Sequence, residues 1–368
     1  MSASDAAAAA FAAFRDPGLV RELIARIGRI VGDRAVNLME VCGTHTMSIG
    51  RYGFRSVMPK GVRLLSGPGC PVCVTSTQDI DRAVALARVP GVTVATFGDM
   101  MRVPGSRSSL RAAKAAGADV RVVYSPLDAL DIAEREPGRE VAFISVGFET
   151  TTPAVAATLL EAAERGLGNF SVLAANKMTP PALRAIANDP ETRIDGFILP
   201  GHVSTITGLA PYRFLADEFG IPGVVTGFEP VDILEGIEQL ALMIAQGAPK
   251  IRNAYRRGVS EEGNPTARAL TDQVFEPADA RWRGLGELPR SGLRIREGFA
   301  RLDAARRFDI PEEPAREHPG CRCGDVLRGR IAPTGCPLFG RACTPEHPVG
   351  PCMVSSEGSC AAYRRYRG

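Results

Sequence analysis

Short apolar runs alternate with amphipathic stretches along this chain from residue 35 to residue 250. The apolar runs predict strands at residues 35–41, 62–65, 92–97, 120–124, 141–146, 170–175, 196–199 and 223–225. The stretches between them predict helices at residues 80–88, 110–116, 127–136, 153–165, 181–188 and 231–245. An earlier helix is expected to run from Asp16 as N-cap, with Pro17 in its first turn, to Gly32. Because a strand buried on both faces reads as a continuous apolar run, the pattern indicates parallel sheets wrapped by helices.

Such strands can close into one barrel or divide between two doubly wound sheets. The loops that follow the strands differ in character, which favours two α/β lobes, expected at residues 1–140 and 141–250. After residue 250 the pattern decays, and residues 253–263, 284–292 and 311–320 are rich in Gly, Pro and charge, as connections are. Residues 251–368 would then form a linker and a small Cys-rich domain, which needs a stabilising element such as a bound metal to fold.

The composition is that of a globular protein, since 45% of the 368 residues are hydrophobic and 23% are charged. Lys plus Arg exceed Asp plus Glu by 44 − 41 = 3, and aromatic residues make up 6%, so no nucleic-acid partner is expected. The N-terminus lacks the charged and apolar regions of a signal peptide, and no apolar run approaches a membrane span in length. We therefore expect a cytoplasmic protein with reduced thiols and no membrane contact.

The nine cysteines fall into an early group of three and a late group of six. In a reducing compartment such clustering favours metal, cluster or redox chemistry over disulfides. Four thiolates with few His neighbours suit an iron–sulfur cluster, with zinc as the competing interpretation. The expected cluster ligands are Cys323, Cys336, Cys343 and Cys360, which leaves Cys321 and Cys352 as spares or as a redox pair. Spacing alone does not decide which four of the six are ligands.

Two early motifs follow strands directly, where open parallel sheets place their ligands. Cys42 opens a Cys-Gly-Thr-His motif in which His45 is a candidate base, ligand or hydrogen-bond partner. A helix starting at Cys42 would favour its thiolate; a buried structural Cys with a capping His is the alternative. Cys70 and Cys73 form a Cys-x-x-Cys motif behind Gly-Pro-Gly. That turn brings two sulfurs within disulfide reach, or offers two thiolates to a metal.

Two later motifs repeat the arrangement of a loop after a strand. In Gly-Phe-Glu-Thr-Thr, the loop around Glu149 and Thr150 could hold an anion, or Glu149 could act as an acid or base. A plain helix cap is the alternative. In Pro-Gly-His-Val-Ser, His202 and Ser204 are further candidates, although a lone His is often structural.

These four motifs, together with Met-Val-Ser-Ser-Glu-Gly-Ser-Cys at residues 353–360, resemble the HypD family of [NiFe]-hydrogenase maturation proteins. The resemblance implies two Rossmann-like lobes and a small domain holding a [4Fe–4S] cluster. It implies a scaffold for the Fe(CN)2CO unit, with iron bound by Cys42 and by a HypC-type chaperone, and cyanide delivered by a HypE-type partner. Cys70 and Cys73 match the pair proposed to exchange electrons with the cluster, while Glu149, Thr150, His202 and Ser204 fall in motifs that line the cleft.

We therefore expect a maturation scaffold with redox activity rather than a standalone metabolic enzyme. Relatives often carry a second His where this chain has Met47, so a role for that imidazole is in doubt. The alternative is an iron–sulfur-dependent thiol–disulfide reductase, which explains Cys70 and Cys73 but leaves Cys42 and His45 idle. A zinc-stabilised interaction module is a further alternative.

Overall fold

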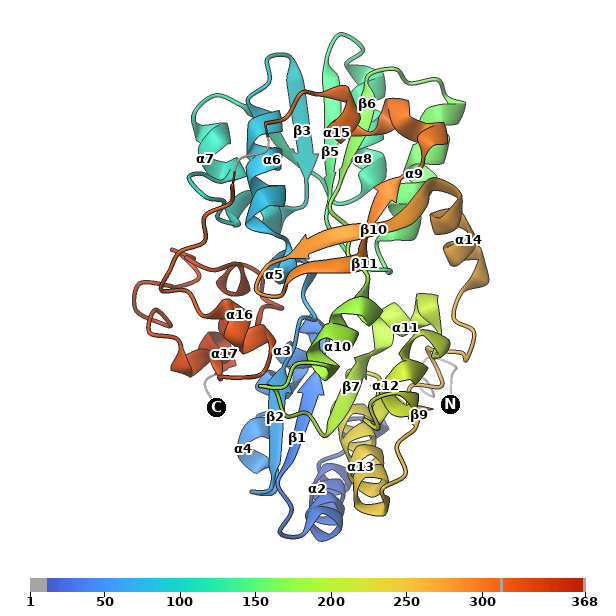
Figure 1. The fold of residues 1–368 in the computed structure, drawn as a ribbon, viewed down its shortest axis with the longest axis vertical. Coiled ribbons are helices and arrows are strands. Elements are labelled where there is room, and N and C mark those ends of the chain that lie inside the picture. Colours follow the sequence, from blue (N-terminus) through green and yellow to red (C-terminus); the bar gives the residue numbers. More distant parts are fainter. Residues whose placement is uncertain (1–11, 312–313, 367–368) are drawn as a thin grey trace.

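The computed structural model describes residues 12–311 and 314–366. It consists of two α/β lobes stacked along the long axis, a β-hairpin across their junction, and a C-terminal segment beside it, residues 314–366 (Figure 1). The N-terminal residues that argued against a signal peptide lie outside the described ranges. Within those ranges, no helix is both long and apolar enough to cross a membrane.

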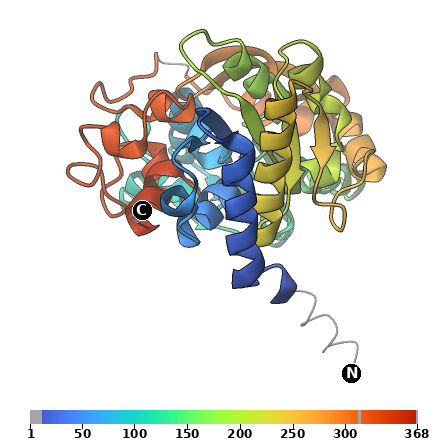
Figure 2. The same ribbon diagram turned by 90° about the horizontal axis from the view of Figure 1, so that it is seen from below.

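Lobe I contains a five-stranded parallel sheet in the order β2-β1-β7-β8-β9. Its strands are β1 (Val36–Glu40), β2 (Val62–Ser66), β7 (Gly196–Pro200), β8 (Gly223–Thr226) and β9 (Ile251–Asn253). Its helices are α2 (Pro17–Val31), α3 (Gly43–Arg51), α4 (Phe54–Val57), α5 (Pro71–Val74), α10 (Thr179–Ala187), α11 (Gly201–Thr207), α12 (Arg213–Asp217) and α13 (Pro230–Gln246). Figure 2 shows α2 and α13 side by side, where they bury one face of the sheet.

Lobe II contains a four-stranded parallel sheet in the order β4-β3-β5-β6. Its strands are β3 (Val92–Thr96), β4 (Asp119–Val122), β5 (Glu140–Ser145) and β6 (Phe170–Ala174). Its helices are α6 (Thr77–Ala87), α7 (Leu110–Ala115), α8 (Pro126–Arg135), α9 (Thr152–Glu164), α14 (Pro265–Val274) and α15 (Ala304–Arg307). The carboxyl ends of both sheets point toward the junction between the lobes (Figure 1).

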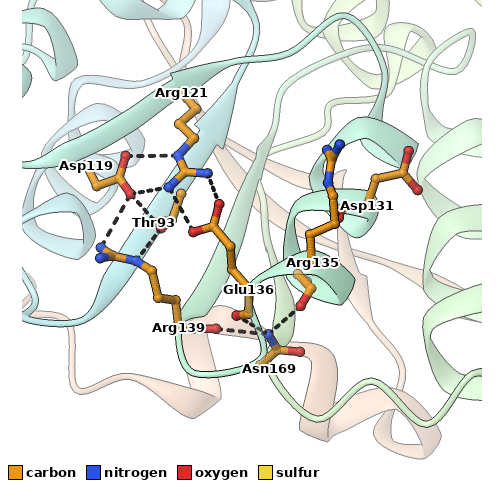
Figure 3. Close-up of polar contacts among 9 residues, drawn as sticks. Thr93, Asp119, Arg121, Asp131, Arg135, Glu136, Arg139 and Asn169 are labelled. Atoms are coloured by element: carbon orange, nitrogen blue, oxygen red, sulfur yellow. Dashed lines mark hydrogen bonds and ion pairs between the residues drawn. The ribbon is translucent and has the colours of Figure 1, made fainter.

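A polar network fastens the edge strand β4 to the end of α8 (Figure 3). The Arg121 guanidinium binds both Asp119, at 2.8 Å, and Glu136, at 2.5 Å. The Asn169 amide donates to the carbonyls of Ala133, Glu136 and Arg139, in the last turn of α8 and the residues that follow it. These contacts order the outer edge of lobe II, away from the junction.

The eight strands expected from the apolar runs are all present, and they form two sheets rather than one barrel. The sheets do not follow a division of the chain at residue 140, because β1 and β2 pair with strands from beyond residue 195. The chain leaves lobe I after β2, builds lobe II as β3–β6, and returns through α10. Consecutive parallel strands are joined by a crossover connection whether or not both strands belong to the same lobe. The pattern of strands and helices in the sequence therefore does not show where the chain passes from one lobe to the other.

The first helix begins and ends where its sequence predicts. The Asp16 carboxylate accepts from the backbone N–H of Leu19 at 2.7 Å, Pro17 occupies the first turn, and Gly32 ends the helix at φ 57°. Leu23, Ile27 and Val31 form its buried face. These contacts satisfy the end groups of the helix while its apolar stripe packs on lobe I.

The expectation of a connection at residues 284–292 is wrong. These residues lie in an antiparallel hairpin of β10 (Phe275–Trp282) and β11 (Gly286–Ile295). The glycines mark its turn, since Gly284 and Gly286 have φ 79° and 84°. The hairpin contacts both halves of the junction through bridges at Thr75 and Lys177.

The C-terminal segment has little regular structure beyond α16 (Cys323–Leu327) and α17 (Ser359–Tyr366). It packs against α3 and α5 of lobe I. Its buried interior is unusually rich in sulfur, with Cys323, Cys343, Cys352 and Cys360 beside Trp282.

Candidate functional site

The site lies at the topological switch point of the lobe I sheet. From the adjacent strands β1 and β7, the chain proceeds to β2 on one side and to β8 on the other. Loops diverge at such a point and leave a crevice outside the carboxyl ends of the strands. Cys42 follows β1 there, His202 follows β7, and Phe228 follows β8.

Cys42 is the N-cap residue of α3 and is 7% exposed. Its backbone N–H donates to the Glu40 carboxyl at 3.2 Å, and that carboxyl also accepts from the Thr46 hydroxyl at 2.5 Å. Burial raises the pKa of Cys42 to about 12. This effect is larger than that of the backbone N–H groups of Thr44 and His45, which lower the pKa. The thiolate expected from the helix N-terminus is therefore disfavoured until a cation replaces the thiol proton.

His45 is fully buried beside Cys42, in contact with the loop after β8. Its Nε2 lies 2.9 Å from the Gly227 carbonyl, which can only accept, so Nε2 carries the proton. Nδ1 is then a lone-pair acceptor, and it has no partner among the described residues. Burial lowers the pKa of His45 to about 4, so the ring is neutral. The ring of Phe228 lies between His45 and His202, with centroids 4.8 and 4.1 Å away.

The C-terminal segment closes over this loop through Glu357. The Thr44 hydroxyl donates to the Glu357 carboxylate at 2.9 Å. A Cβ at Gly43 would lie 2.5 Å from the Glu357 side chain, which explains why glycine follows Cys42. Sequence reasoning missed Glu357, Phe228 and Glu40 as neighbours of Cys42. Glu357 belongs to the motif at residues 353–360, but nothing in the sequence of that motif indicates a contact with Thr44.

The Cys70–Cys73 turn lies directly against the Cys42 loop. The backbone N–H of Gly43 donates to the Gly69 carbonyl at 3.0 Å, and a Cβ at Gly69 would lie 2.1 Å from the backbone nitrogen of Cys42. The Sγ atoms of Cys70 and Cys73 are 2.6 Å apart. The expectation of two sulfurs within reach of one another is confirmed. Burial raises the pKa of the Cys73 thiol well above its usual range.

Sulfur atoms continue from this turn into the C-terminal segment. Cys70, Cys73, Cys323 and Cys352 lie in one buried cluster with Cys321 packed against it, and the Sγ atom of Cys73 is 4.0 Å from the carbonyl oxygen of Pro351, the residue before Cys352. Cys352 was expected to be a spare thiol or half of a redox pair. In the structure it lies between the early and the late group of cysteines. The C-terminal segment therefore folds back against the Cys70–Cys73 turn.

A second group of thiols surrounds Cys360. Burial and the nearby sulfurs of Cys343, Cys321 and Cys336 raise the pKa of the Cys360 thiol well above its usual range. The sulfur of Cys343 also accepts from the backbone N–H of Val349 at 3.3 Å. Cys343 and Cys360 share one buried cluster with Cys323 and Cys352, and Cys321 packs against it. In the described part of the chain, no three His, Cys, Asp or Glu side chains are arranged to hold a single metal ion.

The other candidates lie apart from this centre. Glu149 accepts from the backbone N–H and the hydroxyl of Thr179, at 2.8 and 2.9 Å, and burial raises its pKa. Thr150 is exposed. The Ser204 hydroxyl donates to the Pro200 carbonyl at 2.8 Å, a bond within its own helical turn. Of the expected cleft residues, His202 alone stacks on the ring that also contacts His45.

Comparisons with known proteins agree with one another over nearly the whole chain. The sequence profile of HypD, described as "Hydrogenase formation hypA family", matches residues 18–367. A hydrogenase maturation factor HypD of Rhodobacter capsulatus is 48% identical over 366 residues, covering 96% of this chain and 97% of the relative. That of Rhizobium leguminosarum bv. viciae is 48% identical over 362 residues, with 96% and 94% covered. That of Cupriavidus necator is 47% identical over 362 residues, with 96% of each chain covered.

Proposed function

Because the chain belongs to the HypD family of hydrogenase maturation factors, we propose that it is the scaffold on which iron receives its diatomic ligands. In this proposal the iron is substrate, and it leaves the scaffold carrying cyanide and CO as the Fe(CN)2CO unit. A HypC-type chaperone supplies a second thiolate to the iron, and a HypE-type partner supplies cyanide.

Cys42 is the proposed iron anchor. A thiol at a switch point, with a neutral imidazole lone pair nearby, offers soft donors to a low-spin iron ion. Iron binding replaces the thiol proton, so the high pKa of Cys42 keeps the empty site uncharged and unreactive. His45 Nδ1 is free to accept a hydrogen bond from the chaperone or from a ligand of the iron.

The group around Cys360 is the proposed site of the [4Fe–4S] cluster, with Cys321, Cys336 and Cys343 as the other ligands. Four mostly buried thiols and an N–H···S bond fit a cluster of thiolate-bound iron. A cluster bound there supplies one-electron redox chemistry. This set replaces Cys323 of the sequence-based prediction by Cys321.

Cys323 and Cys352 are then free to act as a dithiol that serves the Cys70–Cys73 pair. When Cys70 and Cys73 form a disulfide, the Cys352 thiolate attacks Cys73 Sγ and Cys70 leaves as a thiolate. Cys323 next attacks Cys352 Sγ, which forms a Cys323–Cys352 disulfide and releases Cys73. Two electrons pass to the pair beside Cys42. The observation that carries the proposal is the buried cluster of thiols that includes Cys70, Cys73, Cys323 and Cys352 and lies beside the Cys42 loop, where Gly69 touches Cys42.

Infrared spectroscopy on the anaerobically purified complex with the chaperone tests the iron site. Cys42→Ala should remove the bands of bound cyanide and CO, while the visible absorption of the cluster is retained. Thr158→Ala, which loses the bond from its hydroxyl to the Ala154 carbonyl within α9 of lobe II, is the matched control and should keep both signals. Cyanide and CO bands that persist in Cys42→Ala would overturn the assignment.

The alternative of a thiol–disulfide reductase acting on other proteins is disfavoured by burial. Cys70 is 4% exposed and Cys73 is fully buried, so a protein disulfide has no access to either sulfur. Exchange with Cys352, inside the same core, needs no such access.

A further inference from the structure

A separate cavity of about 420 Å³ opens at the junction of the lobes, beside α11. Both lobes and the hairpin contribute to it. Its walls are mainly apolar and include four prolines, with Phe275 and Leu293 from the hairpin; the prolines are Pro180, Pro181, Pro211 and Pro277. A cavity of this size, with apolar walls and a few polar groups, is typical of small-molecule sites.

The polar groups of the cavity are few and unevenly placed. Glu149 lies in its wall with both oxygens occupied by Thr179. Arg268 and Arg290 are exposed lining residues, and neither guanidinium has a hydrogen-bond or ion-pair partner among the residues described. Asp272 is the one other charged lining residue, also exposed.

The two arginines come from different elements that converge at the cavity. Arg268 is on α14, and Arg290 is on β11, where its backbone has φ 48°. Arg290 is the one non-glycine residue with positive φ in the described chain. Its backbone N–H donates to the Asp279 carboxylate at 2.8 Å. Two unpaired guanidiniums beside an apolar cavity complement an anion that carries an apolar body.

We propose that this cavity binds a small amphipathic anion, with its apolar body between the prolines and its acidic head group at Arg268 and Arg290. The proposal does not depend on the iron chemistry, because no cysteine lines the cavity. The occupant would nevertheless affect the neighbouring site. Ile206 and Thr207 line the cavity from α11, the same helix that carries His202.

Tyr212 indicates how close the two sites are. It is fully buried, and burial, Glu149 and Cys42 together raise its pKa well above the usual range. Its hydroxyl has no hydrogen-bond partner within the described ranges. Tyr212 follows Pro211 of the cavity wall and packs in one buried cluster with Val41, the residue before Cys42.

Two fluorescent probes with the same kind of apolar body test the proposal on the full-length protein. 8-Anilinonaphthalene-1-sulfonate carries an anionic head, whereas N-phenyl-1-naphthylamine has none. The sulfonate probe should bind once per chain and about tenfold more tightly than the neutral one, the factor expected of one additional charge-assisted contact. Equal binding of the two probes, or tighter binding of the neutral one, would overturn the assignment of the head group.

Variants then locate the probe. The double variant Arg268→Gln, Arg290→Gln changes two exposed side chains, so it should fold normally and reduce sulfonate binding about tenfold. Arg252→Gln, Arg256→Gln, a pair of exposed arginines elsewhere on lobe I, is the matched control and should bind as the unaltered protein does. Ile206→Trp, which fills the cavity, should weaken both probes. Sulfonate binding that is unchanged in the first double variant refutes the site.

Discussion

Gly69→Ala tests the contact between the Cys70–Cys73 turn and the Cys42 loop. The added Cβ would lie 2.1 Å from the nitrogen and 2.4 Å from the Cα of Cys42, and both are backbone atoms. Reaching an ordinary contact of 3.4 Å requires the two loops to separate by 3.4 − 2.1 = 1.3 Å. Overpacking of this kind costs about 2 kcal/mol. If lobe I unfolds as one unit, its melting temperature should fall by roughly 4–8 °C.

Differential scanning calorimetry measures the stability, and infrared spectroscopy of the chaperone complex measures the iron site. We expect both to change, since the backbone that positions Cys42 must move. Gly138→Ala is the matched control, because no atom lies within 4 Å of its added Cβ, and neither measurement should change. A Gly69→Ala protein with unaltered stability and unaltered cyanide and CO bands would refute the proposed contact.

Three further predictions concern the sulfur groups and two buried charges. Cys321→Ala should lose the iron and sulfide of the cluster on anaerobic purification, whereas Cys323→Ala should keep them; the reverse outcome restores the set predicted from spacing. Lys177→Met should lower the free energy of unfolding, measured with denaturant, by about 3 kcal/mol. The reason is that Asp79, whose side chain is 19% exposed, loses the ammonium group that lies 3.0 Å from its carboxylate. Adding Asp79→Leu should recover part of the loss. Burial raises the pKa of Glu149 in the folded state, so the folded protein binds more protons than the unfolded one, and stability should fall as pH rises above 4.5. Glu149→Gln should remove that part of the pH dependence and match the unaltered protein at pH 4.5; an unchanged slope would contradict the assignment.

The strands, the main helices and the positions of the motifs could be predicted because they depend on local sequence. Apolar runs defined the strands, and Asp16 and Gly32 marked a helix by its end groups. The pairing of strands could not be predicted in this way. One of the two neighbours of β1 in the sheet is β7, which comes after the whole of lobe II in the sequence, and pairing at that distance leaves no periodic signal.

The site shows the same limit at the level of side chains. Cys42 and His45 were predicted to act together because one short motif contains both. Glu357 and Phe228 were missed because their contact with that motif depends on tertiary packing alone. The roles of Cys321 and Cys323 could not be separated from spacing, since one residue lies between them. The fold brings the sulfurs of both residues beside Gly350, so the two alanine variants are what distinguishes their roles.

The placement of the cysteines explains why both lobes and the C-terminal segment are needed in one chain. Lobe I alone presents Cys42 and the Cys70–Cys73 turn at its switch point, but the dithiol that contacts Cys73 comes from the C-terminal segment. That segment buries few large apolar side chains of its own, so its position depends on Trp282 of the hairpin and on α3 and α5. The hairpin is in turn held at Thr75, which immediately precedes Ser76, the N-cap residue of α6. The contact between Cys73 and Cys352 therefore depends on the packing of the hairpin and the C-terminal segment as well as on the local turn. A substitution at Trp282, far along the chain from either thiol, should separate them.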